Sequence, residues 1–218
     1  MRYYPLYLDL RNRPVLVVGG GPIAEGKALQ LVEANAEVHL VSPTLTEILR
    51  QRVEQGVIAY RPGEFTETDL DNKVLIISAT NVQAVNEAVA HAAQARGLLC
   101  NVVDQPALCN FITPSLISRG DLQIAISSSG KSPSVAQRVK REISELIGPE
   151  YEMLLEIAAE VRAQARTRLP TYEARRDFLK LFVESKALDL IRLGKIEEVK
   201  PLAENLLNDF VLTSQLNR

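Results

Sequence analysis

The chain has 218 residues, 46% of them hydrophobic and 5% aromatic, and its 25 Lys and Arg nearly balance its 27 Asp and Glu for a net charge of -2. This composition is too apolar for a disordered chain, and the near-neutral charge argues against a protein that binds nucleic acid. No apolar run reaches the roughly 18 residues of a membrane span, and the N-terminus lacks the apolar core of a signal peptide. We therefore expect a globular, cytoplasmic protein with no membrane partner and no nucleic-acid partner.

The part of the chain before Ser132 alternates short, β-branched apolar runs with helical stretches, which is the pattern of a parallel sheet covered by helices. Several of these runs are nearly continuous in Val, Ile and Leu, as strands buried on both faces are. This predicts a Rossmann-like, doubly wound α/β fold. The predicted strands are Pro14 to Val18, Glu37 to Val41, Val57 to Tyr60, Val74 to Ser78, Leu98 to Val103 and Leu122 to Ser127.

Two helices are predicted between these strands. One begins near Pro22 and runs to Ala34, and the other runs from Val82 to Ala95. The second helix is expected to present one apolar face, because its apolar residues recur at helical spacing. The residues expected on that face are Val82, Val85, Val89 and Ala92 or Ala93.

From Ser132 onward the pattern is helical throughout. Ser132 is a good N-cap and Pro133 suits the first helical position, so a helix should begin there. Its apolar residues form a stripe of Val135, Val139, Ile143 and Leu146. Further helices are expected over Tyr151 to Leu169, from Thr171 and from about Ile196.

The sharpest local signal is the segment VLVVGGGPIAEGKAL, in which a buried strand leads through three glycines into a helix. This is G-x-G-x-x-A in the context that dinucleotide binding requires. The first glycine permits a tight turn, and the third removes the side chain where a pyrophosphate approaches the helix N-terminus. The segment predicts NAD binding, and a purely structural turn is the alternative. The residues concerned are Gly19, Gly20, Gly21, Pro22 and Ile23.

The end of the second strand bears on the choice between NAD and NADP. The acidic residue that usually holds the ribose hydroxyls is missing, and Ser42, Pro43 and Thr44 occupy that position. No Arg or Lys stands there to hold a 2′-phosphate, so we expect NAD, with contacts from these residues. Thr80 and Asn81 end a later strand where the nicotinamide-side ribose would lie, and a plain helix cap at Thr80 is the alternative reading.

Four segments occur in a characteristic order: VVGGGPIAEGKAL, ISATN, LLCNVVDQPALCNFITPSLI and IAISSSGKSPSVAQRVKREI. Together they resemble the precorrin-2 dehydrogenase/sirohydrochlorin ferrochelatase family, which includes the N-terminal half of multifunctional siroheme synthases. The resemblance is specific through about Ile147, and the residues after it match only in being helical. Because the chain ends at Arg218, we expect a stand-alone enzyme without the methyltransferase domain of the fused synthases.

The resemblance implies that NAD accepts a hydride from precorrin-2, giving sirohydrochlorin, and that in bifunctional members Fe²⁺ then enters the same cleft. It also implies an interlocked homodimer, with the active site between the nucleotide-binding domain and the helices. We therefore expect an NAD-binding domain over residues 1–113, a dimerisation and active-site segment over 114–148 and a helical domain over 149–218.

Asp104 follows the predicted strand Leu98 to Val103, beside the crevice in which doubly wound sheets bind ligands. It occupies the position of the family's functional aspartate, so the resemblance implies a catalytic role. Its carboxylate could accept the proton released during dehydrogenation, and pyrrole protons as a metal enters. The alternative is a turn aspartate that caps local N–H groups.

The loop from Ser127 to Ser132 offers hydroxyls, backbone N–H groups and a cation to an anion. The substrate that the resemblance implies carries many carboxylates. Ser128 is therefore the first candidate in this loop, and Lys131, Arg138 and Arg141 are candidate clamps. An ordinary linker with solvated charges is the alternative for each of them.

The remaining metal-binding residue types give no metal signal. His39 and His91 have no partner at ligand spacing, and Cys100 and Cys109 are too few and too far apart for a metal knuckle or a disulfide framework. We expect both cysteines to be small buried residues. We expect no metal ligands, so iron would be a transient substrate held mainly by the tetrapyrrole.

Two other functions fit the same sequence features. One is a dehydrogenase without chelatase activity, which would use the same fold and the same aspartate. The other is a non-catalytic NAD-sensing module with a helical dimerisation arm, which would not need Asp104. A sensor would leave the absorbance spectrum of a tetrapyrrole precursor unchanged in the presence of NAD.

Overall fold

The computed structural model describes residues 3–216. The chain forms two compact units, Met1–Thr113 and Pro114–Arg218. Within residues 3–216 no helix combines the length and the apolar character needed to cross a membrane.

The first unit contains five parallel strands in the order β3-β2-β1-β4-β5. This order reverses direction between β1 and β4, which is where doubly wound sheets bind their ligands. The fold class predicted from the sequence is therefore confirmed. The strands are β1 (Pro14–Val18), β2 (Glu37–Ser42), β3 (Ala59–Pro62), β4 (Leu75–Ser78) and β5 (Leu99–Val102).

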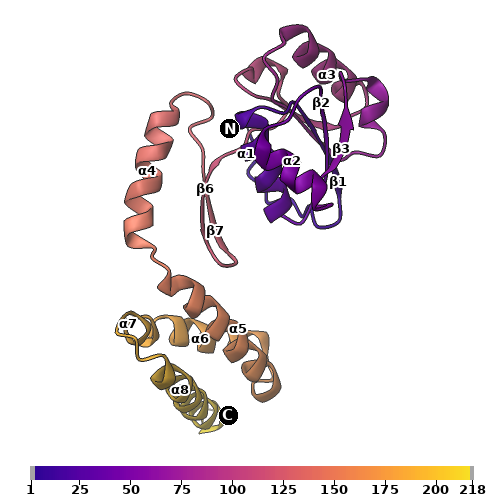
Figure 1. Cartoon of the computed structure of the whole chain (residues 1–218). Helices are drawn as coiled ribbons and strands as arrows, with labels where there is room; N and C mark the ends of the chain where they lie inside the picture. Colours follow the sequence, from indigo (N-terminus) through magenta and orange to yellow (C-terminus); the bar gives the residue numbers. More distant parts are fainter. Residues whose placement is uncertain (1–2, 217–218) are drawn as a thin grey trace. The chain divides into compact units, whose positions relative to one another are not determined.

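Helices cover both faces of this sheet, as Figure 1 shows. Helices α1 (Pro22–Glu33) and α2 (Glu47–Glu54) pack on one face, where Ala28 and Leu49 meet Val15 and Val17. Helix α3 (Gln83–Ala95) and the short 3-10 helix η1 (Glu67–Leu70) pack on the other. The alternation of strand side chains between the two cores explains why these strands are apolar at nearly every position.

Two expectations for this unit are corrected. Strand β3 begins at Ala59, because the amides of Val57 and Ile58 both donate to the carbonyl of Arg52 and close the end of α2. In α3, Val82 precedes the helix and is exposed, whereas Asn86 lies on the buried face together with Val89, Ala90 and Ala93.

The second unit begins with an antiparallel hairpin of β6 (Ser115–Arg119) and β7 (Leu122–Ile126). The expectation that Leu122 to Ser127 belongs to the parallel sheet is therefore wrong. Only Gly120 and Asp121 connect the two strands, and a two-residue connection can join only antiparallel neighbours. Strand β6 escaped prediction because its polar and apolar residues are mixed in a short segment.

Helix α4 (Pro133–Leu146) follows the hairpin and contacts both of its strands. The side chain of Ser132 accepts a hydrogen bond from Val135 N, so the predicted N-cap is confirmed. Within this unit the two ends of the predicted apolar stripe are uncovered, since Val135 is 55% exposed and Leu146 is 70% exposed, whereas Val139 and Ile143 are half-buried. The buried residue of α4 is Ala136, which lies two turns before Ile143 on the same side of the helix.

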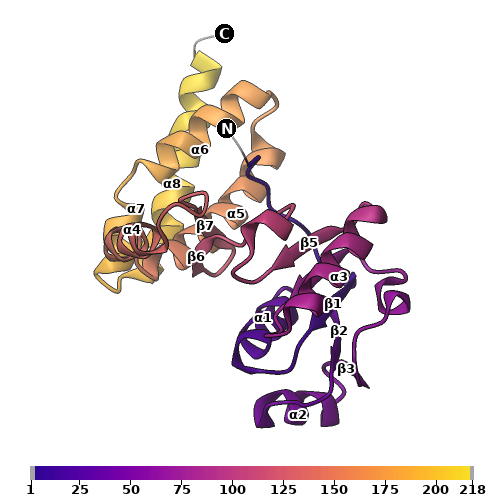
Figure 2. The same cartoon turned by 90° about the horizontal axis from the view of Figure 1, so that it is seen from above.

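The last four helices lie together, as Figure 2 shows, and their buried side chains form one apolar core. They are α5 (Glu150–Arg168), α6 (Tyr172–Val183), α7 (Ala187–Arg192) and α8 (Ile196–Leu216). Phe178 and Phe182 are fully buried in this core, against the α5 residues Ile157 and Val161. Helix α7 was not predicted, because its six residues are too few to show a helical period.

Candidate active site

The glycine turn after β1 is wedged between two other loops. A Cβ on Gly19, whose φ is +124°, would lie 2.4 Å from the carbonyl oxygen of Ala79. A Cβ on Gly20 would lie 1.9 Å from the carbonyl oxygen of Thr44. Only glycine fits at these two positions, because both clashes are with backbone. The turn thus lies between the loops that follow β2 and β4 and contacts both of them, at the point where the strand order reverses.

Gly21 has different surroundings, since a Cβ there would meet nothing within 4 Å. It is the N-cap of α1, and Pro22 follows at the first helical position. No side chain among residues 3–216 caps this helix, so the first-turn N–H groups are open to a ligand. Ile23 is 52% exposed beside them. The arrangement fits a dinucleotide, whose pyrophosphate can approach a helix N-terminus that carries no side chain at its cap.

The loop after β2 divides into a buried part and an exposed part. Ser42 is 5% exposed, and its Oγ accepts a hydrogen bond from Thr44 N at 3.4 Å. Its carbonyl accepts another from the hydroxyl of Tyr60 at 2.8 Å. Ser42 therefore holds the loop in place, and the residues it leaves exposed are Pro43 and Thr44.

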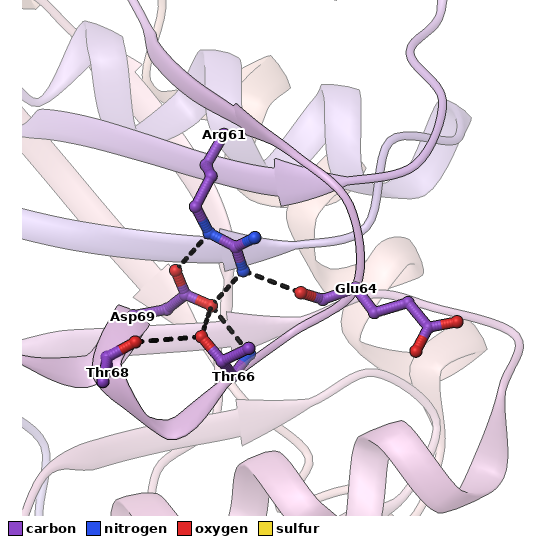
Figure 3. Close-up of polar contacts among 5 residues, drawn as sticks. All are labelled: Arg61, Glu64, Thr66, Thr68 and Asp69. Carbon is purple, nitrogen blue, oxygen red and sulfur yellow. Dashed lines mark hydrogen bonds and ion pairs between the residues drawn. The ribbon is translucent and has the colours of Figure 1, made fainter.

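The cation on the adjoining strand is already engaged, as Figure 3 shows. Arg61 pairs in register with Val41, but its Nε donates to Asp69 Oδ1 at 2.6 Å and its Nη2 donates to the carbonyl of Glu64 at 2.7 Å. Thr66 N donates to the second oxygen of Asp69. Arg61 is thus committed to the β3–β4 connection, which leaves the preference for NAD over NADP intact.

The loop after β4 rests on a buried polar pair that sequence reasoning missed. Ser78 Oγ donates to Asn86 Oδ1 at 2.7 Å, and Asn86 Nδ2 donates to the carbonyl of Thr80 at 3.0 Å. The only signal was a single amide on the otherwise apolar face of a predicted helix. Thr80 Oγ1 accepts from Val82 N at 3.2 Å, which is a local turn contact, and Asn81 is exposed.

Asp104 lies at the same edge of the sheet, in the turn that follows β5. The turn is closed by Gln105 N, which donates to the carbonyl of Val102 at 3.2 Å, and tied to β4 by Val103 N, which donates to the carbonyl of Ser78. Asp104 has a φ of +59° and is exposed. Within residues 3–216 its carboxylate has no hydrogen-bond or ion-pair partner, so the structure gives no support to the capping alternative.

The candidate substrate residues gather in the second unit, before and along α4. Ser128 Oγ accepts from Ser132 N at 3.2 Å, which shapes the loop, and Lys131 is exposed. Arg138 donates to Glu142 at 2.8 Å across one helical turn. Arg141 is exposed and lies one turn from Arg138, so the two guanidinium groups share a side of the helix.

The histidines and cysteines occupy different environments. Burial, and then the charge of Lys73, lower the pKa of the half-buried His39, so it is neutral at pH 7. His91 is exposed on α3. Cys100 is buried as expected, but Cys109 is only half-buried and is hydrogen-bonded. In the part of the chain that the structure describes, no three His, Cys, Asp or Glu side chains are grouped to hold a metal ion.

Three family models match successive parts of the chain. Their descriptions are "Putative NAD(P)-binding" for residues 6–115, "Sirohaem biosynthesis protein central" for residues 119–146 and "Sirohaem synthase dimerisation region" for residues 150–207. The first covers half of the 218-residue chain. The match continues beyond Ile147, through residues 150–207, where the resemblance noted from the sequence extended only to helical character.

Known proteins agree with these matches. Siroheme synthase of Photobacterium profundum is 36% identical over 206 residues, or 94% of this chain and 44% of that protein. Siroheme synthase 1 of Klebsiella pneumoniae subsp. pneumoniae is 40% identical over 209 residues, or 96% of this chain and 44% of that protein. The chain therefore spans less than half the length of these relatives. Among solved structures, SirC, a precorrin-2 dehydrogenase, matches 93% of this chain and 100% of its own with 28% identity and a TM-score of 0.79. The chain belongs to the precorrin-2 dehydrogenase and siroheme synthase family.

Proposed function

We propose that this protein is an NAD-dependent dehydrogenase that converts precorrin-2 to sirohydrochlorin. The observation that carries the proposal is the common position of the glycine turn, the Thr80 loop and the unpartnered Asp104 carboxylate at the carboxyl edge of one parallel sheet. Ligands of doubly wound sheets bind at this edge. Membership of the family supplies the substrate class, and the likeness to SirC supports the same reaction.

The glycine turn is proposed to bind NAD. The pyrophosphate would lie against Gly21 and the free N–H groups of Ile23 and Ala24, where the positive end of the helix dipole faces the negative charge. The two riboses would contact the loop residues Pro43, Thr44, Thr80 and Asn81. Ser42 holds Thr44 in position by accepting a hydrogen bond from its backbone N–H. When bound, NAD supplies the acceptor for a hydride.

Asp104 is proposed to accept the proton that leaves precorrin-2 as the hydride departs, so that two electrons and two hydrogens are removed in all. An exposed carboxylate without a partner is free to take a proton from a bound ligand. We assign to Ser128, Lys131, Arg138 and Arg141 the binding of substrate carboxylates, for which guanidinium groups are well suited.

A homodimer is part of the proposal. The match of residues 150–207 to a dimerisation region supports it, and so do the exposed ends of the apolar stripe on α4, Val135 and Leu146. The division into an NAD-binding domain (1–113), a dimerisation and active-site segment (114–148) and a helical domain (149–218) is proposed on the same grounds. A cytoplasmic location stays a prediction from the sequence.

The test is direct. Incubation of the purified protein with precorrin-2 and NAD without oxygen should convert the spectrum of precorrin-2 to that of sirohydrochlorin, with one NADH formed for each molecule converted. An unchanged spectrum with NAD bound would instead identify a sensor module. Iron insertion is measured separately, from sirohydrochlorin and Fe²⁺, because the relatives are named siroheme synthases and sirohaem contains iron.

A further inference from the structure

The segment that follows Asp104 is anchored along the outer edge of β5 by one asparagine. Asn110 Oδ1 accepts from Cys100 N at 2.8 Å, and Asn110 Nδ2 donates to the carbonyl of Leu98 at 2.7 Å. The backbone N–H of Asn110 donates to the carbonyl of Cys100 at 3.0 Å. Three hydrogen bonds therefore fix the chain at residue 110 and, with it, the neighbouring Cys109.

From this anchored position the thiol of Cys109 reaches back to the Asp104 turn. Its Sγ accepts from Val102 N at 3.1 Å. The same thiol faces two carbonyl oxygens, that of Val102 at 3.2 Å and that of Gln105 at 3.3 Å, and its single hydrogen can donate to either. Val102 and Gln105 are the first and last residues of the turn, so one side chain ties together both of its ends.

The thiol must keep its proton to donate in this way. Burial raises the pKa of the Cys109 thiol, and the hydrogen bond from Val102 N opposes this only in part. The group is therefore a neutral thiol near pH 7, which is both a weak donor and a weak acceptor.

Asp104 itself contributes nothing to the closure of the turn. Its side chain has no partner among residues 3–216, and its φ of +59° is a conformation that L residues adopt at some energetic expense. The position of its carboxylate is therefore set by the backbone on either side of it. The Cys109 thiol holds that backbone together with two backbone hydrogen bonds, from Gln105 N to the carbonyl of Val102 and from Val103 N to the carbonyl of Ser78.

We propose that Cys109 is a positioning residue that fixes the Asp104 turn, and through it the carboxylate, in the geometry that proton transfer requires. The proposal rests on the proposed catalytic role of Asp104. It assigns to this cysteine a function in the reaction although its sulfur takes no part in the chemistry.

The main test compares Cys109→Ala with Cys109→Ser. Alanine removes all three contacts, whereas a serine hydroxyl can still donate to a carbonyl and accept from Val102 N. With saturating NAD, Cys109→Ala should lower kcat by about 10-fold, since small displacements of a catalytic group have effects of this size or larger. KM for precorrin-2 and the affinity for NAD should be unchanged. Cys109→Ser should restore most of kcat.

Amide hydrogen exchange gives a readout that is independent of activity. Cys109→Ala should speed exchange at Val102 and Gln105, whose N–H groups belong to the braced turn. Cys100→Ala is the matched control, because Cys100 is fully buried on β5, the strand that leads into the turn, and its thiol makes none of these contacts. This control should lower the melting temperature without faster exchange in the turn.

A double variant shows whether Cys109 acts through Asp104. If it does, adding Cys109→Ala to Asp104→Asn should slow the reaction no further. If the double variant instead shows the product of the two rate losses, the proposal is overturned. A Cys109→Ala protein with wild-type kcat and wild-type amide exchange at residues 102–105 would also overturn it. If Asp104→Asn alone reacts at the wild-type rate, the catalytic role of Asp104 fails, and the proposal built on it is overturned even where exchange shows a braced turn.

Discussion

Gly21 differs from the two glycines before it because its missing side chain leaves open space instead of relieving a clash. Gly21→Asp should therefore fold normally and lose NAD binding, since the carboxylate would repel the pyrophosphate. Titration with NAD and a melting curve measure the two effects. Gly26→Asp is the matched control, because Gly26 lies in the same helix and also faces open space. Wild-type NAD affinity in a folded Gly21→Asp protein would contradict the assignment.

The positive φ of Asp104 decides which substitutions test it. Ala at φ of +59° costs about 1 kcal/mol, whereas Asn and Gly tolerate this conformation. Asp104→Asn should keep stability and NAD affinity and lower the dehydrogenation rate about 10²- to 10⁴-fold, as removal of a general base does. Asp104→Gly should be at least as stable and equally impaired. A stable Asp104→Asn protein with an undiminished rate would place the base elsewhere.

At the scale of single residues, the sequence was informative where a residue type is required by backbone geometry or by direct contact with a ligand. Gly19 and Gly20 could be identified because only glycine fits a turn of this kind. Asn86 and Cys109 could not, although their hydrogen-bond partners lie only four to eight residues away along the chain. These contacts depend on the conformation of the turns after β4 and β5, which the residue types alone do not reveal.

The connection between β3 and β4 offers a pH test at the scale of one element. Burial would raise the pKa of Asp69, but hydrogen bonds from Arg61 and Thr66 outweigh it and lower the pKa. Because the pKa of Asp69 is lower in the folded state, its ionised form stabilises the protein at pH values above the unfolded-state pKa of about 3.9. This contribution is lost as the pH falls through the folded-state pKa.

Asp69→Asn should therefore destabilise the protein by about 1.5 kcal/mol near neutral pH, a value kept low because Arg61 is partly exposed. The difference from the wild type should shrink in acid, where Asp69 of the wild type becomes protonated. Urea unfolding across this pH range measures it. Asp71→Asn is the control, since the ion pair of Asp71 with Arg96 is exposed and should contribute little. A pH-independent effect of Asp69→Asn would argue against the pair.

Whole elements were predictable in proportion to their length and periodicity. The helices α1, α4 and α5 and four strands of the parallel sheet lie close to their expected bounds. The pairing of the hairpin was predicted wrongly, because a short, mostly apolar segment such as β7 has the same sequence pattern in a parallel and in an antiparallel sheet. Its pairing is decided by the two-residue turn and by a partner strand with a weak apolar signal.

For the whole molecule, the main prediction concerns assembly. The apolar stripe of α4 and the dimerisation match of residues 150–207 occupy different stretches of the unit. Val135→Glu changes the α4 stripe, and Leu193→Glu changes the region of the dimerisation match. Both residues are largely exposed in the protomer, so folding should be preserved. Light scattering at micromolar concentration should find a wild-type dimer and weaker association in Val135→Glu.

The two variants separate the two stretches. A monomeric Leu193→Glu beside a dimeric Val135→Glu would move the interface to the C-terminal helices. Ile48→Glu, in α2 of the first unit, is the control for adding charge to an exposed apolar position and should remain dimeric. A wild-type protein that is monomeric at these concentrations would refute the dimer itself.

The anchoring of Asn110 has a consequence for solubility. β5 is the last strand of its sheet, and an unprotected last strand offers free N–H and C=O groups on which another chain can assemble. Here the side-chain amide of Asn110 forms the hydrogen bonds that a neighbouring strand would otherwise make with Cys100 N and the carbonyl of Leu98. The sulfur of Cys109 accepts from the N–H of Val102. At this edge of the sheet, the atoms of Asn110 and Cys109 that shape the Asp104 turn therefore also occupy backbone groups with which a strand of another chain would pair.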